Sequence, residues 1–237
     1  MRLLLPDIGL TINGRFTNSK FKAIIDSYDN KYYLDENKNG YLVLAVNDKL
    51  LLSWKVVNNE IYYKYMGFHH INNTVLELDS FTYGNDKEYC KITSDGLEMG
   101  IELFNTYENI KYDSNKKYTC QISLYVYDFI DIYKDEEEYK KTIDYQDTGL
   151  RDISTNIICV NPVDYSEIIN SLVFLTGIVK DIKRLTNPYK GEEYREVIID
   201  SYKHDYTCYF RCSNFSNLQV GNIVSGEFMV TGMIKEK

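Results

Sequence analysis

The sequence predicts an all-β protein in which an antiparallel amino-terminal meander, forming a barrel or a sandwich, precedes a small carboxy-terminal β-barrel. Three observations predict this class. Short β-prone runs alternate with polar turn clusters about every 8 to 12 residues, as in antiparallel sheets. Aromatic residues, which favour half-buried pleated surfaces, make up 14% of the 237 residues, and only 3 residues are proline. Helix signals are confined to one or two short segments between the two units.

The first unit, an antiparallel β domain, is expected within residues 1–130. Turn sequences such as Asn39-Gly40 supply the positive φ that tight hairpins require. In the last expected strand, Ile122, Leu124 and Val126 alternate with tyrosines, as in a strand with one buried face. The expected strands cover 31–34, 41–46, 50–57, 61–71, 75–83, 88–93, 97–104 and 118–130.

The second segment, residues 131–170, is expected to be an acidic helical linker. Eight acids and three lysines occupy 128–147, which favours a solvated helical face, with an acidic docking surface as the alternative. Two pairs of opposite charge stand four residues apart, a spacing that supports a helix: Glu136 with Lys140, and Glu137 with Lys141. A second short helix is expected over 162–170, where Asn161 offers an N-cap and Pro162 the first helical position.

The third unit, residues 171–237, contains four expected strands, at 172–182, 194–200, 206–212 and 223–232. The first strand carries Gly177 ahead of an Ile-Val pair, the second ends in Asp200, and Leu218 is followed after two residues by Gly-Asn and the fourth strand. This order resembles that of OB-fold domains. Gly177 would allow the close backbone approach that a small barrel needs where its long first strand bends.

Two features depart from the usual OB pattern. Residues 213–219 form too short a linker for the helix that commonly joins the third and fourth strands. Only five residues follow Gly232, which is too few for a separate fifth strand. The strand that closes the barrel is therefore expected either from 157–160 or from the first unit.

The OB resemblance implies a recognition face around the second and third strands, which binds oligonucleotides, oligosaccharides or proteins in that family. Along the third strand, Cys208 and Phe210 are expected to face the core and Tyr209 and Arg211 to face outward. A tyrosine beside a guanidinium suits stacking on an unpaired base, and nearby cations suit a phosphate backbone. In the alternative, these cations pair with neighbouring acids. The candidate binding residues are Lys180, Lys183, Arg184, Lys190, Arg195, Tyr209 and Arg211.

The charge distribution favours a partner protein over nucleic acid. The formal net charge is -8, and residues 1–170 carry all of the acidic excess, since residues 171–237 are slightly basic. An acidic body repels phosphates, so nucleic-acid binding would rest on a local basic groove. The longest apolar runs are far shorter than a membrane span, and the amino terminus lacks the pattern of a secretory signal. Five scattered cysteines indicate free thiols, and a cytoplasmic location is expected.

The sequence offers no catalytic motif. His69 and His70 are adjacent on an expected strand, so they point to opposite faces. His204, Cys208 and Cys212 stand four residues apart, which on a strand separates neighbours by about 13 Å, too far for one metal. We expect a non-catalytic binding or adaptor protein without a cofactor, which recognises a partner protein. The alternatives are single-stranded nucleic-acid binding by the OB-like unit and binding of a small apolar ligand inside the first unit.

Overall fold

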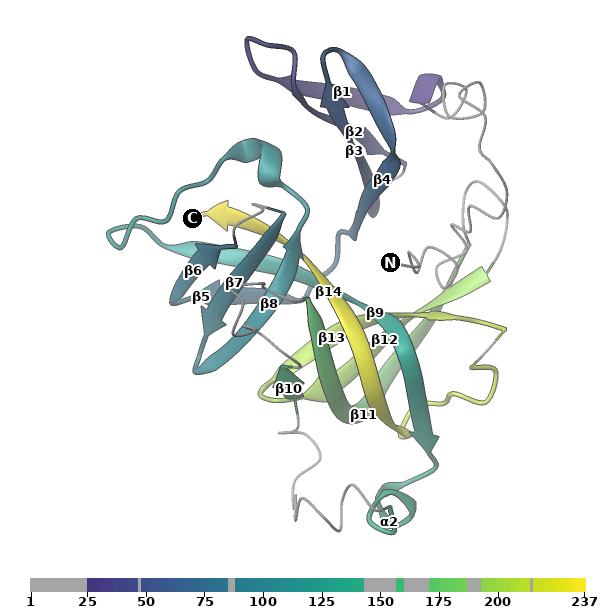
Figure 1. Cartoon of the computed structure of the whole chain (residues 1–237). Helices are drawn as coiled ribbons and strands as arrows, with labels where there is room; N and C mark the ends of the chain where they lie inside the picture. The colour runs from purple at the N-terminus through teal and green to yellow at the C-terminus, as the bar shows by residue number, and fades with distance from the viewer. Residues whose placement is uncertain are drawn as a thin grey trace.

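The computed structural model describes residues 25–46, 48–84, 88–142, 157–159, 171–186, 193–213 and 215–237. The fold is all-β, as the sequence predicts, with a closed five-stranded barrel and a separate antiparallel sheet (Figure 1). Within the described residues, no helix is long and apolar enough to cross a bilayer.

The separate sheet is a four-stranded antiparallel meander in the order β1-β2-β3-β4, which we call the meander sheet. Its tight turns follow the local sequence: Asn58 and Asn59, between β3 and β4, both adopt positive φ, at 52° and 66°. The four strands are β1 (Asp29–Leu34), β2 (Gly40–Ala45), β3 (Leu50–Val57) and β4 (Glu60–His70).

All other strands belong to one highly curved ten-stranded sheet. Its strands are β5 (Val75–Leu78), β6 (Ser80–Tyr83), β7 (Tyr89–Ser94), β8 (Leu97–Leu103), β9 (Tyr118–Tyr133), β10 (Ile157–Cys159), β11 (Leu172–Thr186), β12 (Glu193–Ser201), β13 (His204–Arg211) and β14 (Ile223–Glu236). Two short helices, η1 (Thr106–Glu108) and α2 (Glu136–Tyr139), follow β8 and β9.

The barrel closes through β9, a strand that precedes the OB-like unit in the chain. β11 pairs with β12 and β14, and β12 pairs with β13. β9 then completes the ring by pairing in parallel with β13, at Cys208 and Leu124, and antiparallel with β14. The structure therefore selects the first unit as the source of the closing strand. β10, the other expected source, pairs with β11 instead.

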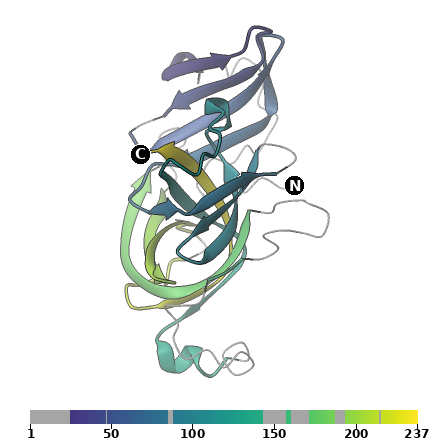
Figure 2. The same ribbon diagram turned by 90° about the vertical axis from the view of Figure 1, so that its left-hand side faces the viewer.

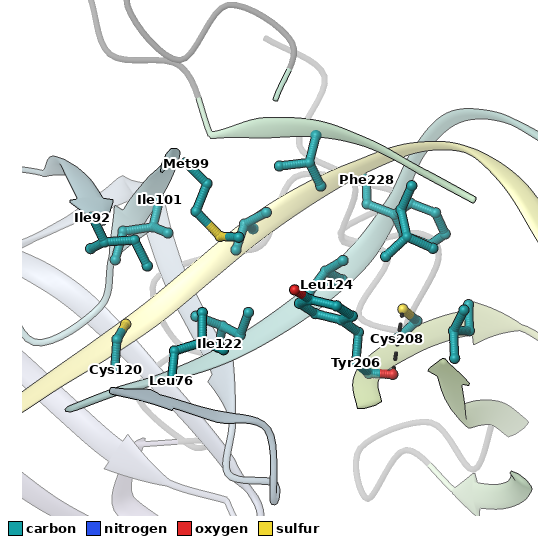
Figure 3. Close-up of a cluster of buried hydrophobic side chains, with 14 of the residues drawn as sticks. Leu76, Ile92, Met99, Ile101, Cys120, Ile122, Leu124, Tyr206, Cys208 and Phe228 are labelled. Atoms are coloured by element: carbon teal, nitrogen blue, oxygen red, sulfur yellow. Dashed lines mark hydrogen bonds between the residues drawn. The ribbon is translucent and has the colours of Figure 1, made fainter. Parts of the chain in front are cut away.

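Beyond the barrel, β9 and β14 continue side by side into a second ring of strands (Figure 1). β8 pairs with β14, β7 pairs with β8, and β6 pairs with β7. Only Asp79 separates β6 from β5, and β5 pairs back to β9. The second ring is filled by its own side chains, which form one core with those of the barrel (Figure 3).

The meander sheet packs on the outer wall of the barrel, and Figure 2 shows it stacked at one end of the molecule. Every second residue of β2 and β3 is apolar and buried on this side, including Leu42 and Trp54. Their partners are Tyr125 from β9, Tyr209 from β13 and Met229 from β14. This contact covers the part of the barrel on which the predicted recognition face lies.

The short linker after β13 closes the end of the barrel where OB folds commonly carry a helix. Leu218 is buried in the barrel core, and Phe215 packs edge-on against Phe210 with ring centroids 5.2 Å apart. Two apolar side chains from a turn thus cover part of the barrel core.

The described start of the acidic segment, residues 131–142, is more extended than the sequence suggests. β9 continues to Tyr133 because Ile130 and Ile132 keep the inward alternation and pack against the core. The helix covers only Glu136–Tyr139, although both expected ion pairs form, Glu136 with Lys140 and Glu137 with Lys141. The second expected helix, at 162–170, lies outside the described residues.

Candidate functional site

The tyrosine of the predicted recognition face lies beneath the meander sheet. Tyr209 points outward from the barrel, as predicted, but it is fully buried. Its ring stacks on His70 with centroids 4.0 Å apart, and its hydroxyl donates a hydrogen bond to Glu196 at 3.2 Å. The expectation that Tyr209 offers a ring face to an unpaired base is therefore corrected, because a sheet from far earlier in the chain occupies that face.

The seam between the meander sheet and the barrel is polar at its centre. His70 Nδ1 lies 2.9 Å from the Tyr125 hydroxyl, and its Nε2 lies 3.1 Å from the Tyr194 hydroxyl. His69 points to the opposite side, as predicted, with Nδ1 2.8 Å from Thr231 Oγ1. Burial lowers the pKa of His70 to about 3 and that of His69 to about 4. Both imidazoles are therefore neutral members of a structural network.

The predicted surface cations face carboxylates. Lys180 lies 2.7 Å from Asp205 and 3.2 Å from Asp200. Lys183 lies 3.9 Å from Glu196, and Arg184 lies 4.0 Å from Glu193. Each of these three cations thus has an acidic neighbour, as the alternative interpretation holds, which weakens any attraction for a phosphate backbone.

The remaining candidate residues are scattered. Arg195 is buried, because it shares the inward-facing side of β12 with Val197 and Ile199. Its Nη1 donates to the Leu218 carbonyl at 3.2 Å and its Nη2 to the Ser216 carbonyl at 3.4 Å, so it fastens the linker. The expectation that Arg195 is a surface binding residue is corrected accordingly. Arg211 is half-buried, and Lys190 lies outside the described residues.

A bulge in β9 creates the most distinctive exposed feature of the barrel. The β9–β14 register shifts between Gly226 and Phe228, so that Tyr127, Asp128 and Phe129 stand opposite Glu227 alone. Regular alternation would point Asp128 into the barrel, between the inward residues Val126 and Ile130. The bulge instead leaves all three residues exposed. Bulges commonly redirect side chains at functional positions.

Gly226 makes the bulge possible. A Cβ atom at this position would lie 2.3 Å from the Phe129 carbonyl oxygen and 2.9 Å from the Ile130 Cα. Both contacts are with backbone, so no side-chain rotation relieves them. The bulged backbone therefore rests directly on a glycine that cannot be enlarged without moving it.

The bulge presents an aromatic surface. Phe129 is 48% exposed and Tyr127 is 39% exposed, both on the outer side of the barrel. Phe174 of β11, which is half-buried, lies beside them, with its ring centroid 6.1 Å from that of Phe129. Together with the neighbouring acids, these residues form what we call the bulge surface: Tyr127, Asp128, Phe129, Asp131, Phe174 and Glu227.

The three acids of the bulge surface have no ionic partner among the residues that the structure describes. On the neighbouring strands, Glu227 stands opposite Phe174, and Asp131 stands opposite Ser225, two residues from Glu227. Within the described residues, no ion pair or hydrogen bond reaches the carboxylates of Asp128, Asp131 or Glu227. This distinguishes them from the acids that neutralise Lys180, Lys183 and Arg184.

Sequence reasoning missed the bulge surface, although the signal is present. Along β9 every second residue from Leu124 to Ile132 is apolar except Asp128, which breaks the inward series. An acid at an inward position, with Gly226 on the facing strand, indicates a local departure from regular pairing. In the described part of the chain, no group of three potential metal ligands gathers at this surface or elsewhere.

Comparison with known proteins gives no relative: no family model matches the chain, and neither a curated protein nor a solved structure is significantly similar to it.

Proposed function

We propose that the protein is a cytoplasmic, non-catalytic binding protein that recognises a partner protein through the bulge surface. The observation that carries this proposal is the pair of exposed aromatic side chains, Tyr127 and Phe129, held on a bulge in the hydrogen-bonded wall of a closed barrel. Aromatic side chains are enriched in protein interfaces and dominate their binding energy. Because the barrel positions both rings in advance, little conformational entropy is lost when a partner covers them.

The electrostatics of the surface support a protein partner over nucleic acid. The exposed rings stand among Asp128, Asp131 and Glu227, acids without an ion pair in the described part of the chain, and these acids repel phosphate groups. The tyrosine expected to stack on bases, Tyr209, lies under the meander sheet. No observation on the described residues favours the nucleic-acid alternative.

The proposal is tested by affinity capture from the source cell. The wild-type chain is expected to recover one stoichiometric protein, and Tyr127→Ala/Phe129→Ala is expected to lose it. Tyr32→Ala/Leu34→Ala is the matched control, because these residues are also two apart on one strand and are 47% and 38% exposed. The control is expected to recover the same protein in the same amount as wild type.

Two outcomes contradict the proposal. One is the absence of any stoichiometric protein in the wild-type capture. The other is its recovery in equal amounts with the Tyr127→Ala/Phe129→Ala variant, which would place the contact elsewhere on the chain.

A further inference from the structure

We infer that the bulge surface receives basic side chains, lysine or arginine, from a segment of the partner protein. This inference rests on the proposed function and specifies the chemistry of the partner. It follows from two properties that the same few residues combine: exposed aromatic faces, and carboxylates without a counter-charge among the described residues.

The aromatic part of the surface suits a cation. Phe129 and Phe174 meet at an interplanar angle of 50°, so their rings form two inclined walls. A lysine ammonium or arginine guanidinium over such a ring face is attracted by the electrons of the ring. The aliphatic stem of either side chain also packs well on exposed aromatic carbon, in this case on Tyr127 and Phe129.

The carboxylates act in the same direction. Glu227 is half-buried between the bulge and Phe174, where an incoming cation would be partly shielded from water. Asp128 and Asp131 border the rings from β9. Among the residues that the structure describes, no lysine or arginine forms an ion pair with these three acids, so each could pair with a cation of a partner.

Charge also selects among possible occupants. The chain as a whole carries a net charge of -8, so an acidic protein or a phosphate-bearing polymer would be repelled at long range and again at the surface. A second copy of this chain is a poor occupant, because it carries the same net charge of -8 and would be repelled in the same way. A basic segment of a different protein can place its cations both over the aromatic rings and beside the carboxylates.

The inference is tested with two fluorescein-labelled probe peptides that differ only in charge. One alternates leucine with lysine over twelve residues, and the other has glutamine in place of each lysine. Binding to the full-length protein is measured by fluorescence anisotropy at low and high salt. We expect the lysine peptide to bind wild type about tenfold more tightly than the glutamine peptide at low salt, and this difference to shrink at high salt.

Substitutions test whether the preference for the lysine peptide arises at the bulge surface. Asp128→Asn/Asp131→Asn/Glu227→Gln keeps the shape of each side chain and is expected to remove the preference for the lysine peptide. The control, Asp26→Asn/Glu36→Gln/Glu60→Gln, removes the same number of charges from exposed positions elsewhere and is expected to keep it. Tyr127→Ala/Phe129→Ala is expected to weaken binding of both peptides.

The inference is overturned if the lysine peptide does not bind wild type, if the two peptides bind equally, or if the control variant loses the preference as fully as the bulge variant. The affinity capture described above distinguishes this failure from that of the proposed function. If the captured partner is lost with Tyr127→Ala/Phe129→Ala but retained with Asp128→Asn/Asp131→Asn/Glu227→Gln, the proposed function stands. The inference that the partner is basic is then wrong.

Discussion

Tyr209 and Phe129 both point outward from the same barrel, but Tyr209 is buried and Phe129 is exposed. Tyr209 lies under the meander sheet, stacked on His70, whereas Phe129 is about half exposed. Strand alternation assigns each side chain to the inside or the outside of the barrel, and for Tyr209 it does so correctly. Alternation does not predict whether another element covers the outer side of the barrel. That covering decides which outward residue is available to a partner.

The buried histidines predict a pH dependence of stability. Because burial depresses the pKa values of His69 and His70 to about 4 and about 3, the unfolded chain binds more protons than the native chain below the ordinary histidine pKa. The free energy of unfolding should therefore decrease as the pH is lowered from about 7 to about 5, by about 2 kcal/mol for each histidine. Urea unfolding at several pH values measures this slope.

The control for this prediction is His69→Gln, which removes one titrating group and keeps an amide able to reach Thr231. Its slope should be about half that of wild type over the same range. Equal unfolding free energies at both ends of the range in wild type would show that the histidines are not buried in neutral form.

At the scale of elements, the β9 bulge depends on the facing strand as much as on its own sequence. β14 supplies Gly226, on whose missing side chain the bulged backbone rests, and the inward residues on either side of the bulge remain in the core. Asp128 is therefore turned to solvent without interrupting the barrel. The clue in the sequence is a single acid in an apolar series, which becomes interpretable only when the partner strand and its register are known.

Gly226→Ala is expected to displace the bulge. The added methyl group meets the Phe129 carbonyl, so the chain should be destabilised by about 1–3 kcal/mol and partner capture should fall even where the protein remains folded. Urea unfolding and the affinity capture measure the two effects.

Gly232→Ala is the matched control on the same strand. Its Cβ would lie 2.6 Å from Ile101 Cδ1, so it crowds a side chain rather than the bulge. It is expected to lower stability while partner capture is retained. Capture that falls equally in both variants would mean that loss of stability, and not the position of the bulge, controls binding.

At the scale of the whole molecule, β9 and β14 join the two units that the sequence predicts as separate, residues 1–130 and 171–237. Both strands take part in the barrel and in the second ring, and the side chains of the two rings form one continuous core. The meander sheet adds a second apolar cluster against the outside of the barrel. We therefore expect residues 1–130 and 171–237 to depend on each other for folding, since the barrel lacks its closing strand without β9.

Trp54 offers a direct measurement of this dependence. It is the only tryptophan and is buried between the meander sheet and the barrel, so its fluorescence reports on that contact, whereas circular dichroism reports on all strands. The two probes are expected to give coincident urea transitions. An isolated 171–237 fragment is expected to lack a cooperative transition. A separate, earlier transition of Trp54 would show that the meander sheet unfolds independently.

The sequence by itself determined the all-β class, the positions of nearly all strands and the inward alternation of their side chains, because these follow from local periodicity and turn residues. The inward position of Arg195 was readable in the same way, from its alternation with Val197 and Ile199. Only the tertiary structure decided that β9 closes the barrel, that the meander sheet covers Tyr209, and that the bulge exposes Phe129. These outcomes depend on pairings between segments distant in the chain, and local periodicity records that a face is apolar without recording what packs against it.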